Sequence, residues 1–285
     1  MSTSDQTYKA YSFADHSEVY SILEVVFKEF RIAYYLIGAN ARDVALYKAG
    51  QKPNRGTADI DFAVMVPDFE SYSQLKERIK EKGFEDTNGN APYRLFYPQS
   101  NTVIDLLPYG KIAQDHTVNF ADRAIELSIV GMQEVGEAVE IFEHPDGLSI
   151  PVAPAHGIVI LKLISWSEKP DRIKDLKDIK SLLEAAWQLY EAELYVEDSN
   201  YADLFDEDDF HMHLIAARVM GRKMQAILNQ STSLKQLIIT EIEKELKETA
   251  GPKSIQIVSG TNQAVKEVKS IFNALAKGIR DEIQL

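Results

Sequence analysis

Two acidic residues separated by a single residue, Asp59 and Asp61, interrupt an apolar run that ends at Val66. Such a run predicts a β-strand, whose successive side chains point to opposite faces of the sheet. Ile60 and Phe62 would therefore enter the core while both carboxylates project from the other face. Two carboxylates held this close repel each other unless a cation lies between them. Mg²⁺ is bound by one or two carboxylates together with substrate phosphates, so the pair indicates phosphoryl chemistry on a nucleoside triphosphate.

The chain as a whole has the composition of a globular protein. Its 285 residues suffice for two domains and a sizeable core. It has no cysteine, which excludes disulfides and thiolate metal sites. No signal peptide is visible, and no run approaches the roughly 20 apolar residues that span a bilayer. We therefore expect no membrane association and a cytoplasmic location.

Charge is unevenly distributed along the chain. The net charge of -13 argues against a protein that coats nucleic acid non-specifically. From residue 210 onward, however, 11 Lys and Arg stand against 7 Asp and Glu, which leaves -17 (20 basic, 37 acidic) for the rest. The basic tail fits either the solvated faces of amphipathic helices or a surface for an acidic partner, for example tRNA.

Hydrophobic periodicity divides the chain into a mixed first part and a helical second part. The first part predicts strands and helices in alternation, with strands at 34–37, 59–66, 93–97, 102–107 and, as a pair, within 138–152, and helices at 16–31, 39–48 and 69–82. The second part predicts helices alone, at about 154–166, 172–194, 210–228, 233–249 and 262–281. The expected fold class is α+β, with domains at 1–152 and 153–285 and an exposed acidic loop at about 197–209.

Two further positions extend the acidic pair into a candidate site. Gly38 lies where a strand turns into a helix, so the backbone can approach a ligand closely and the helix amides can attract phosphate. Asp105 has apolar neighbours on the strand at 102–107. Three acids on adjacent strands could hold two Mg²⁺ about 4 Å apart. The alternatives are solvent-facing acids at the end of a strand for the pair and a hydrogen-bonded structural acid for Asp105.

This order of motifs resembles the polymerase-β-type nucleotidyltransferase superfamily, whose pattern is a glycine turn, an acid-x-acid strand and a third acid on a later strand. Five segments are similar, more closely, to a bacterial group of predicted nucleotidyltransferases related to the abortive-infection nucleotidyltransferase toxins of type IV toxin–antitoxin systems. These segments are 38–43, 55–62, 103–110, 161–166 and 174–179. The resemblance covers about residues 30–190 and implies a mixed sheet with flanking helices.

The resemblance also implies roles for individual residues. Asp59, Asp61 and Asp105 would bind the metals, and Asp105 would also act as base for the incoming hydroxyl. Lys162 would steady the triphosphate, oriented by the two acids that follow it on one helix face. The residues expected to bind nucleotide are Gly38, Ala39, Asn40, Arg42, Arg55, Lys162, Asp175 and Asp178.

Several of these positions have a second interpretation. Ala39 stands where the wider superfamily usually has serine or glycine, so a hydroxyl donor to the phosphates is lost unless Asn40 supplies one. Asp43 suits a structural salt bridge or helix cap. Asp178 suits an i,i+4 ion pair with Lys174. Arg42 and Arg55 are candidates for phosphate contacts because a guanidinium binds phosphate bidentately.

Taken together, these features predict a Mg²⁺-dependent nucleotidyltransferase that moves a nucleoside monophosphate from an NTP such as ATP to an acceptor hydroxyl. The acceptor stays open between an RNA 3′ end, a protein and a small molecule, and a cognate antitoxin is a candidate partner of a toxin-like enzyme. One alternative is a weakly active or inactive nucleotide-binding or regulatory module of the same fold, which Ala39 favours. Another is a helical interaction protein whose tail binds a partner.

Overall fold

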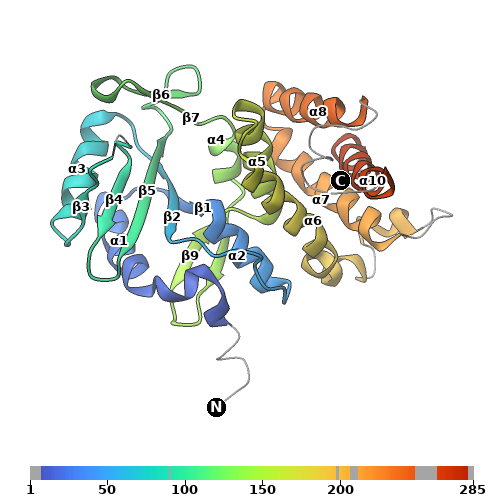
Figure 1. Ribbon diagram of the computed structural model, residues 1–285, viewed down its shortest axis with the longest axis horizontal. Helices are drawn as coiled ribbons and strands as arrows, with labels where there is room; N and C mark the ends of the chain where they lie inside the picture. The colour runs from blue at the N-terminus through green and yellow to red at the C-terminus, as the bar shows by residue number, and fades with distance from the viewer. Residues whose placement is uncertain (1–7, 90, 197–198, 206–210, 248–261, 282–285) are drawn as a thin grey trace, which may run out of the picture. The chain divides into compact units, whose positions relative to one another are not determined.

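The structure is a computed structural model that describes residues 8–89, 91–196, 199–205, 211–247 and 262–281. The chain forms two compact units, which are coloured along the sequence in Figure 1. The sheet unit consists of Met1–Tyr47 and Lys52–Pro154, and the helical unit of Lys48–Gln51 and Ala155–Leu285. The α+β fold class expected from the sequence is confirmed, including the mixed sheet and the helical C-terminal region.

In the described residues, the sheet unit is built on a seven-stranded mixed sheet with the order β3-β4-β5-β2-β1-β9-β8. β2 lies at the centre, antiparallel to β1 and parallel to β5. The acid-x-acid segment thus belongs to the central strand, which is paired on both sides. The strands are β1 (Tyr34–Ile37), β2 (Asp59–Met65), β3 (Glu85–Asp86), β4 (Arg94–Tyr97), β5 (Thr102–Tyr109), β8 (Glu140–Glu143) and β9 (Ser149–Val152).

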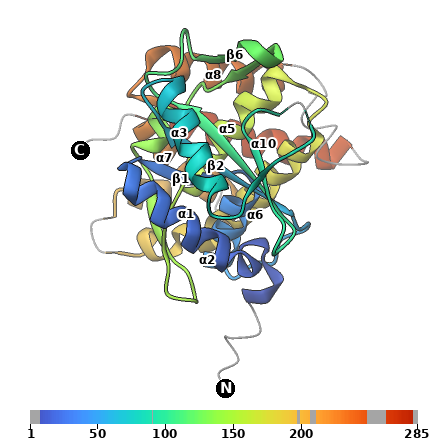
Figure 2. The same cartoon turned by 90° about the vertical axis from the view of Figure 1, so that its left-hand side faces the viewer.

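Helices α1 and α3 cover one face of this sheet, as Figure 2 shows. Phe62 of β2 packs edge-on against Tyr20 and Phe27 of α1, with ring centroids 6.0 and 5.8 Å apart. Because side chains alternate along a strand, Asp59 and Asp61 lie on the face of the sheet opposite to that of Ile60 and Phe62. The helices of the sheet unit are α1 (Ser17–Phe30), α2 (Gly38–Lys48), α3 (Phe69–Lys80) and α4 (Met132–Gly136).

Every strand and helix expected from the sequence is present, with differences at the ends only. The expected strands include short ones such as 34–37, which is wholly apolar, but several other elements of two to five residues contain polar residues and show no clear pattern, so the sequence does not predict them. These are β3, α4, the separate hairpin of β6 (Thr117–Phe120) and β7 (Ile125–Ser128), and the 3-10 turns at Tyr8–Ala10, Ser12–Asp15, Ala121–Arg123 and Ala202–Phe205.

The helical unit is held by close helix packing. Its helices are α5 (Ala155–Glu168), α6 (Ile173–Leu194), α7 (Met212–Leu228), α8 (Thr232–Lys247) and α10 (Asn262–Arg280). α7 and α10 cross at Gly221 and Gly278, where each backbone lies against the other: a Cβ on Gly278 would be 2.1 Å from the Arg218 carbonyl oxygen. Glycine at the crossing therefore sets the distance between the two helices. In the described part of the chain, no helix has both the length and the apolar character needed to cross a bilayer.

The acidic segment expected at about 197–209 is described only at residues 199–205. Asp203, on the 3-10 turn there, pairs with the buried Arg222 of α7, whose Nη1 lies 2.7 Å from Asp203 Oδ1. Arg222 Nε also donates to Asp281 Oδ2 at 2.6 Å. The described residues of the segment are thus tied to the helices, and the rest of the segment lies outside the described residues.

We predict that Gly278→Ala lowers the free energy of unfolding by about 2 kcal/mol, since an added methyl group overpacks the α7–α10 crossing. In an isolated helix the same change would stabilise by about 1 kcal/mol, so the sign of the effect identifies the crossing. Denaturant unfolding measures it. The control is Gly56→Ala, where a Cβ meets no atom within 4 Å. A Gly278→Ala variant as stable as the wild type would contradict the tight crossing.

Candidate functional site

The strand register brings one arginine and two of the acids into a single row. Asp61 of β2 is the partner of Asp105 of β5, and Asp105 is the partner of Arg94 of β4. Neighbouring strands lie about 4.8 Å apart, so the three side chains stand next to one another on one face of the sheet. Asp59 precedes Asp61 by two residues and shares that face. The three acids predicted from the sequence therefore lie on adjacent strands.

Arg94 is a residue of this row that the sequence analysis did not single out. Its Nε donates to Asp105 Oδ1 at 2.7 Å and its Nη2 to Oδ2 at 2.8 Å, while Nη2 also reaches Asp59 Oδ2 at 3.4 Å. The hydrogen bonds to Asp105 raise the pKa of Arg94 above its ordinary value. The sequence does contain a pattern that indicates Arg94: in a hairpin whose register pairs Tyr97 with Thr102, Arg94 pairs with Asp105.

The side chains of this row differ in exposure. The Asp105 side chain is 9% exposed, against 35% for Arg94 and 42% for Asp59. In the described residues, no three His, Cys, Asp or Glu side chains gather closely enough to hold a metal ion. A guanidinium lies between Asp105 and Asp59 instead. The metal-binding role of Asp59, Asp61 and Asp105 stays a prediction.

Gly38 opens α2 directly beside Asp61. The preceding residue, Ile37, is the strand partner of Asp61. Gly38 itself has a φ of +68°, which glycine adopts without strain. A Cβ at this position would lie 2.0 Å from Asp61 Oδ2. The first turn of α2 thus lies against an acid, and the positive end of the helix dipole stabilises that charge. The glycine is required by the contact as well as by its backbone angle.

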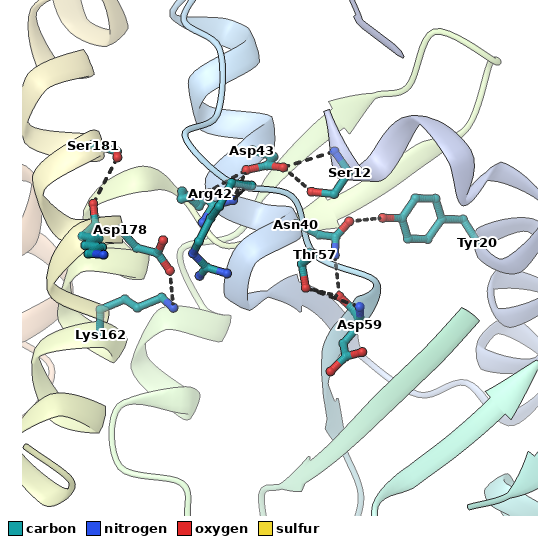
Figure 3. A network of polar contacts seen from close by, with 12 residues as sticks. Ser12, Tyr20, Asn40, Arg42, Asp43, Thr57, Asp59, Lys162, Asp178 and Ser181 are labelled. Atoms are coloured by element: carbon teal, nitrogen blue, oxygen red, sulfur yellow. Dashed lines mark hydrogen bonds and ion pairs between the residues drawn. The ribbon is translucent and has the colours of Figure 1, made fainter. Parts of the chain in front are cut away.

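Asn40, the third residue of α2, holds the start of β2 in place. Its Nδ2 donates to the Asp59 carbonyl oxygen at 2.8 Å, and its Oδ1 accepts from the Tyr20 hydroxyl at 3.3 Å (Figure 3). The Asp59 amide donates to Thr57 Oγ1 at 3.3 Å. Both Asn40 and its neighbour Ala39 are buried. Asn40 thereby positions Asp59, whereas the predicted contact of Ala39 and Asn40 with nucleotide stays a prediction.

Arg42 and Asp43 form a buried ion pair on the same helix, with Arg42 Nε 2.8 Å from Asp43 Oδ1. Arg42 Nη2 donates to the Arg55 carbonyl oxygen at 2.9 Å, and Asp43 Oδ2 accepts from the Ser12 amide at 3.1 Å and from its hydroxyl. Figure 3 shows Asp43 between Ser12 and Arg42. The structural salt bridge expected for Asp43 is present. The predicted phosphate contacts of Arg42 and Arg55 stay predictions.

In the helical unit, Lys162 lies between two buried acids of α6. Its Nζ is 2.7 Å from Asp175 Oδ1 and 2.7 Å from Asp178 Oδ2, and Arg172 Nε lies 2.6 Å from Asp175 Oδ2. Figure 3 shows the contact of Lys162 with Asp178. The two acids, on one face of a helix, fix the ammonium group. The role of Lys162, Asp175 and Asp178 in nucleotide binding stays a prediction.

We predict that Gly38→Ala destabilises the protein by about 2 kcal/mol or more, because the methyl group meets Asp61 and alanine is strained at this φ. The matched control is Gly50→Ala, where φ is +67°, within one degree of that of Gly38, but where a Cβ would meet nothing within 4 Å. Unfolding midpoints of the two variants separate the contact from the backbone strain. Equal losses in both variants would contradict a specific contact with Asp61.

We predict that Lys162→Met costs about 3 kcal/mol of unfolding free energy, since it leaves a buried carboxylate pair without its ammonium. Lys162 is 10% exposed, and its partners Asp175 and Asp178 are 0% and 2% exposed. The control is Lys177→Met on the exposed side of α6, which should change the midpoint of denaturation little. A Lys162→Met variant of wild-type stability would contradict the ion-pair assignment.

Two solved structures illustrate what the chain is similar to. The antibiotic-resistance factor ANT(2'')-Ia is 15% identical, with 66% of this chain and 94% of that chain covered and a TM-score of 0.36. An antigenic nucleotidyltransferase-like protein from Paracoccidioides brasiliensis is also 15% identical, with 80% and 93% covered and a TM-score of 0.41. Likenesses at these TM-scores carry no argument about the site.

The comparison with protein families is decisive. No curated protein matches the chain significantly. The family model described as "Nucleotidyl transferase AbiEii toxin, Type IV TA system" matches residues 35–247, which is well over half of the chain. The matched span contains the start of α2, the acid-x-acid strand β2, and β4 and β5. The chain therefore belongs to the AbiEii nucleotidyltransferase toxin family, and it is a nucleotidyltransferase.

Proposed function

We propose that this protein transfers a nucleoside monophosphate from an NTP to an acceptor hydroxyl with the help of a divalent cation, Mg²⁺ in the cell, and releases pyrophosphate. The observation that carries the proposal is the register of the central sheet. It aligns Asp61 with Asp105 on parallel strands and puts Asp59 on the same face. Family membership supports the reaction class. The alignment supports the choice of residues.

The chemistry of the side chains fits a cation. Like charges on neighbouring strands repel, and here a guanidinium already compensates Asp105 and Asp59. The carboxylate oxygens of Asp59, Asp61 and Asp105 are the ligands that Mg²⁺ prefers, and these residues would hold it. When bound, the cation supplies neutralisation of phosphate charge and polarisation of the attacking hydroxyl.

The remaining steps belong to the chain's own residues. In the proposal, Asp105 accepts the proton of the acceptor hydroxyl on a carboxylate oxygen as that hydroxyl attacks the α-phosphorus, and the bond to pyrophosphate breaks. The amides at the start of α2, beginning with Gly38, face the phosphates. Asn40 keeps Asp59 in place through its bond to the Asp59 carbonyl oxygen. Positioning and electrostatic stabilisation then supply the rate.

The biological setting in the proposal follows the family description. We infer a cytoplasmic toxin of a type IV toxin–antitoxin pair, whose cognate antitoxin is a second protein. The acceptor hydroxyl stays open between an RNA 3′ end such as that of tRNA, a protein side chain and a small molecule. Incubation of the protein with each α-labelled NTP, Mg²⁺ and a cell extract identifies what becomes labelled.

We predict that the double substitution Asp59→Asn and Asp61→Asn lowers transfer of labelled nucleotide by about a thousandfold or more, because the charges that hold the cation are lost. The fold should persist, since the Asn40 bond goes to the backbone of Asp59. The label in the acceptor measures transfer, and circular dichroism checks the fold.

The matched control is Asp115→Asn with Asp122→Asn, which removes two exposed acids and changes the net charge equally. It should transfer label at the wild-type rate. A double Asp59/Asp61 variant that still labels its acceptor at that rate would rule out the proposed site. A wild-type protein that labels nothing with any NTP would favour a regulatory nucleotide-binding module.

A further inference from the structure

We propose that Arg94 serves as the resident cation of the carboxylate row and exchanges partners when a metal-bound polyphosphate arrives. Its guanidinium then leaves Asp105 and Asp59 for the phosphates, while the carboxylates take the divalent cation. The inference deepens the proposed function and rests on it. Arg94 thus holds the carboxylates before the polyphosphate arrives and binds the phosphates afterwards.

The first support is that one set of oxygen atoms serves both partners. The guanidinium uses Oδ1 and Oδ2 of Asp105 together, at 2.7 and 2.8 Å, and it also reaches Asp59 Oδ2. A bidentate arginine–carboxylate pair is among the strong charge-assisted hydrogen bonds. The guanidinium occupies the inner edge of the carboxylate, so a metal cannot chelate both Asp105 oxygens from that edge while these hydrogen bonds remain. Metal binding by Asp105 and the present contacts of Arg94 therefore compete.

The second support is the balance of charge. Asp59, Asp61 and Asp105 carry three negative charges and Arg94 one positive charge, so the site as a whole attracts a divalent cation. A guanidinium that stays on the Asp105 and Asp59 oxygens nevertheless repels the cation at close range. A cation that arrives with a polyphosphate brings a new anionic partner for the guanidinium. Two ion pairs then exchange partners and no charge is left unpaired. Arginine suits this exchange because its planar fork matches carboxylate and phosphate alike.

The third support is that the Arg94 side chain has room to leave. It is 35% exposed, so its release buries no charge. The outer neighbour β3 pairs with β4 only at Leu95 and Phe96, so that β3 ends before it reaches the position of Arg94. The guanidinium is thus held by the acids and not by a closed neighbouring strand.

The test measures cation binding without any turnover. Full-length wild type and Arg94→Gln are titrated with Mn²⁺ alone, and free Mn²⁺ is followed by electron paramagnetic resonance. We expect Arg94→Gln to bind Mn²⁺ about tenfold more tightly, because the competitor is gone. The same proteins are titrated with Mn²⁺–tripolyphosphate by calorimetry. There we expect Arg94→Gln to bind about tenfold more weakly, because the new partner of the phosphates is gone.

The control is Arg78→Gln on α3. Its side chain is 34% exposed, it also pairs with two acids, Glu29 and Glu81, and its loss changes the net charge equally. The affinities of Arg78→Gln for Mn²⁺ and for Mn²⁺–tripolyphosphate should both stay within about twofold of wild type. Arg94→Lys keeps the charge without the bidentate fork. It should tighten Mn²⁺ binding by about threefold, and it decides the matter if Arg94→Gln fails to fold by circular dichroism.

Opposite signs in the two titrations support the exchange, since a merely structural loss weakens both. Unchanged or weaker Mn²⁺ binding by Arg94→Gln overturns it, as does unchanged binding of Mn²⁺–tripolyphosphate or the absence of Mn²⁺ binding in every variant. The proposed function is judged separately by nucleotide labelling. If the wild type labels an acceptor but Arg94→Gln does not change the two affinities in opposite directions, only the exchange is ruled out. If the two affinities change in opposite directions but no acceptor is labelled, only the proposed transfer is ruled out.

Discussion

The parallel pairing of β2 with β5 at the centre of the sheet is the constraint on which the site depends. It aligns Asp61 with Asp105, and the hairpin from β4 to β5 then aligns Arg94 with the same acid. Phe62, directly after Asp61 on β2, packs on α1 and fixes which face carries charge. A slip of one residue would send the acids into the aromatic core, so the burial of the apolar face enforces the register of the polar one.

Much of this arrangement follows from the sequence. Long periodic segments predict the helices, and the alternation around Asp59 and Asp61 predicts a strand with acids on one face. Gly38 is recognised as a turn, but its contact with Asp61 Oδ2 depends on the pairing of β1 with β2, which no local pattern contains. The hairpin β6–β7 is not predicted because each of its strands has only four residues, too few to establish an alternation of apolar and polar side chains. Arg94 is not predicted because its pairing with Asp105 depends on the register of the β4–β5 hairpin, which has to be counted from the turn.

Polar residues expected to meet a nucleotide have structural partners as well. Asn40 fixes the backbone of Asp59, Arg42 holds Asp43 and the Arg55 carbonyl oxygen, and Lys162 neutralises two buried acids. Loss of activity in a variant of any of them therefore mixes a change of fold with a change of chemistry. Arg94 and Asp59, being more exposed, are positions where chemistry can be altered with less structural loss.

The glycine contact of α7 with α10 changes how the C-terminal third can be studied. Phe272, Leu275 and Ile279 of α10 have no exposed surface, so this helix completes the interior of its unit. A truncation before residue 262 would uncover the apolar flank of α7 and invite aggregation, and it would not yield a shortened but intact enzyme. Whether the basic tail recruits a partner is therefore a matter for substitutions of exposed lysines, such as Lys277, in the whole chain.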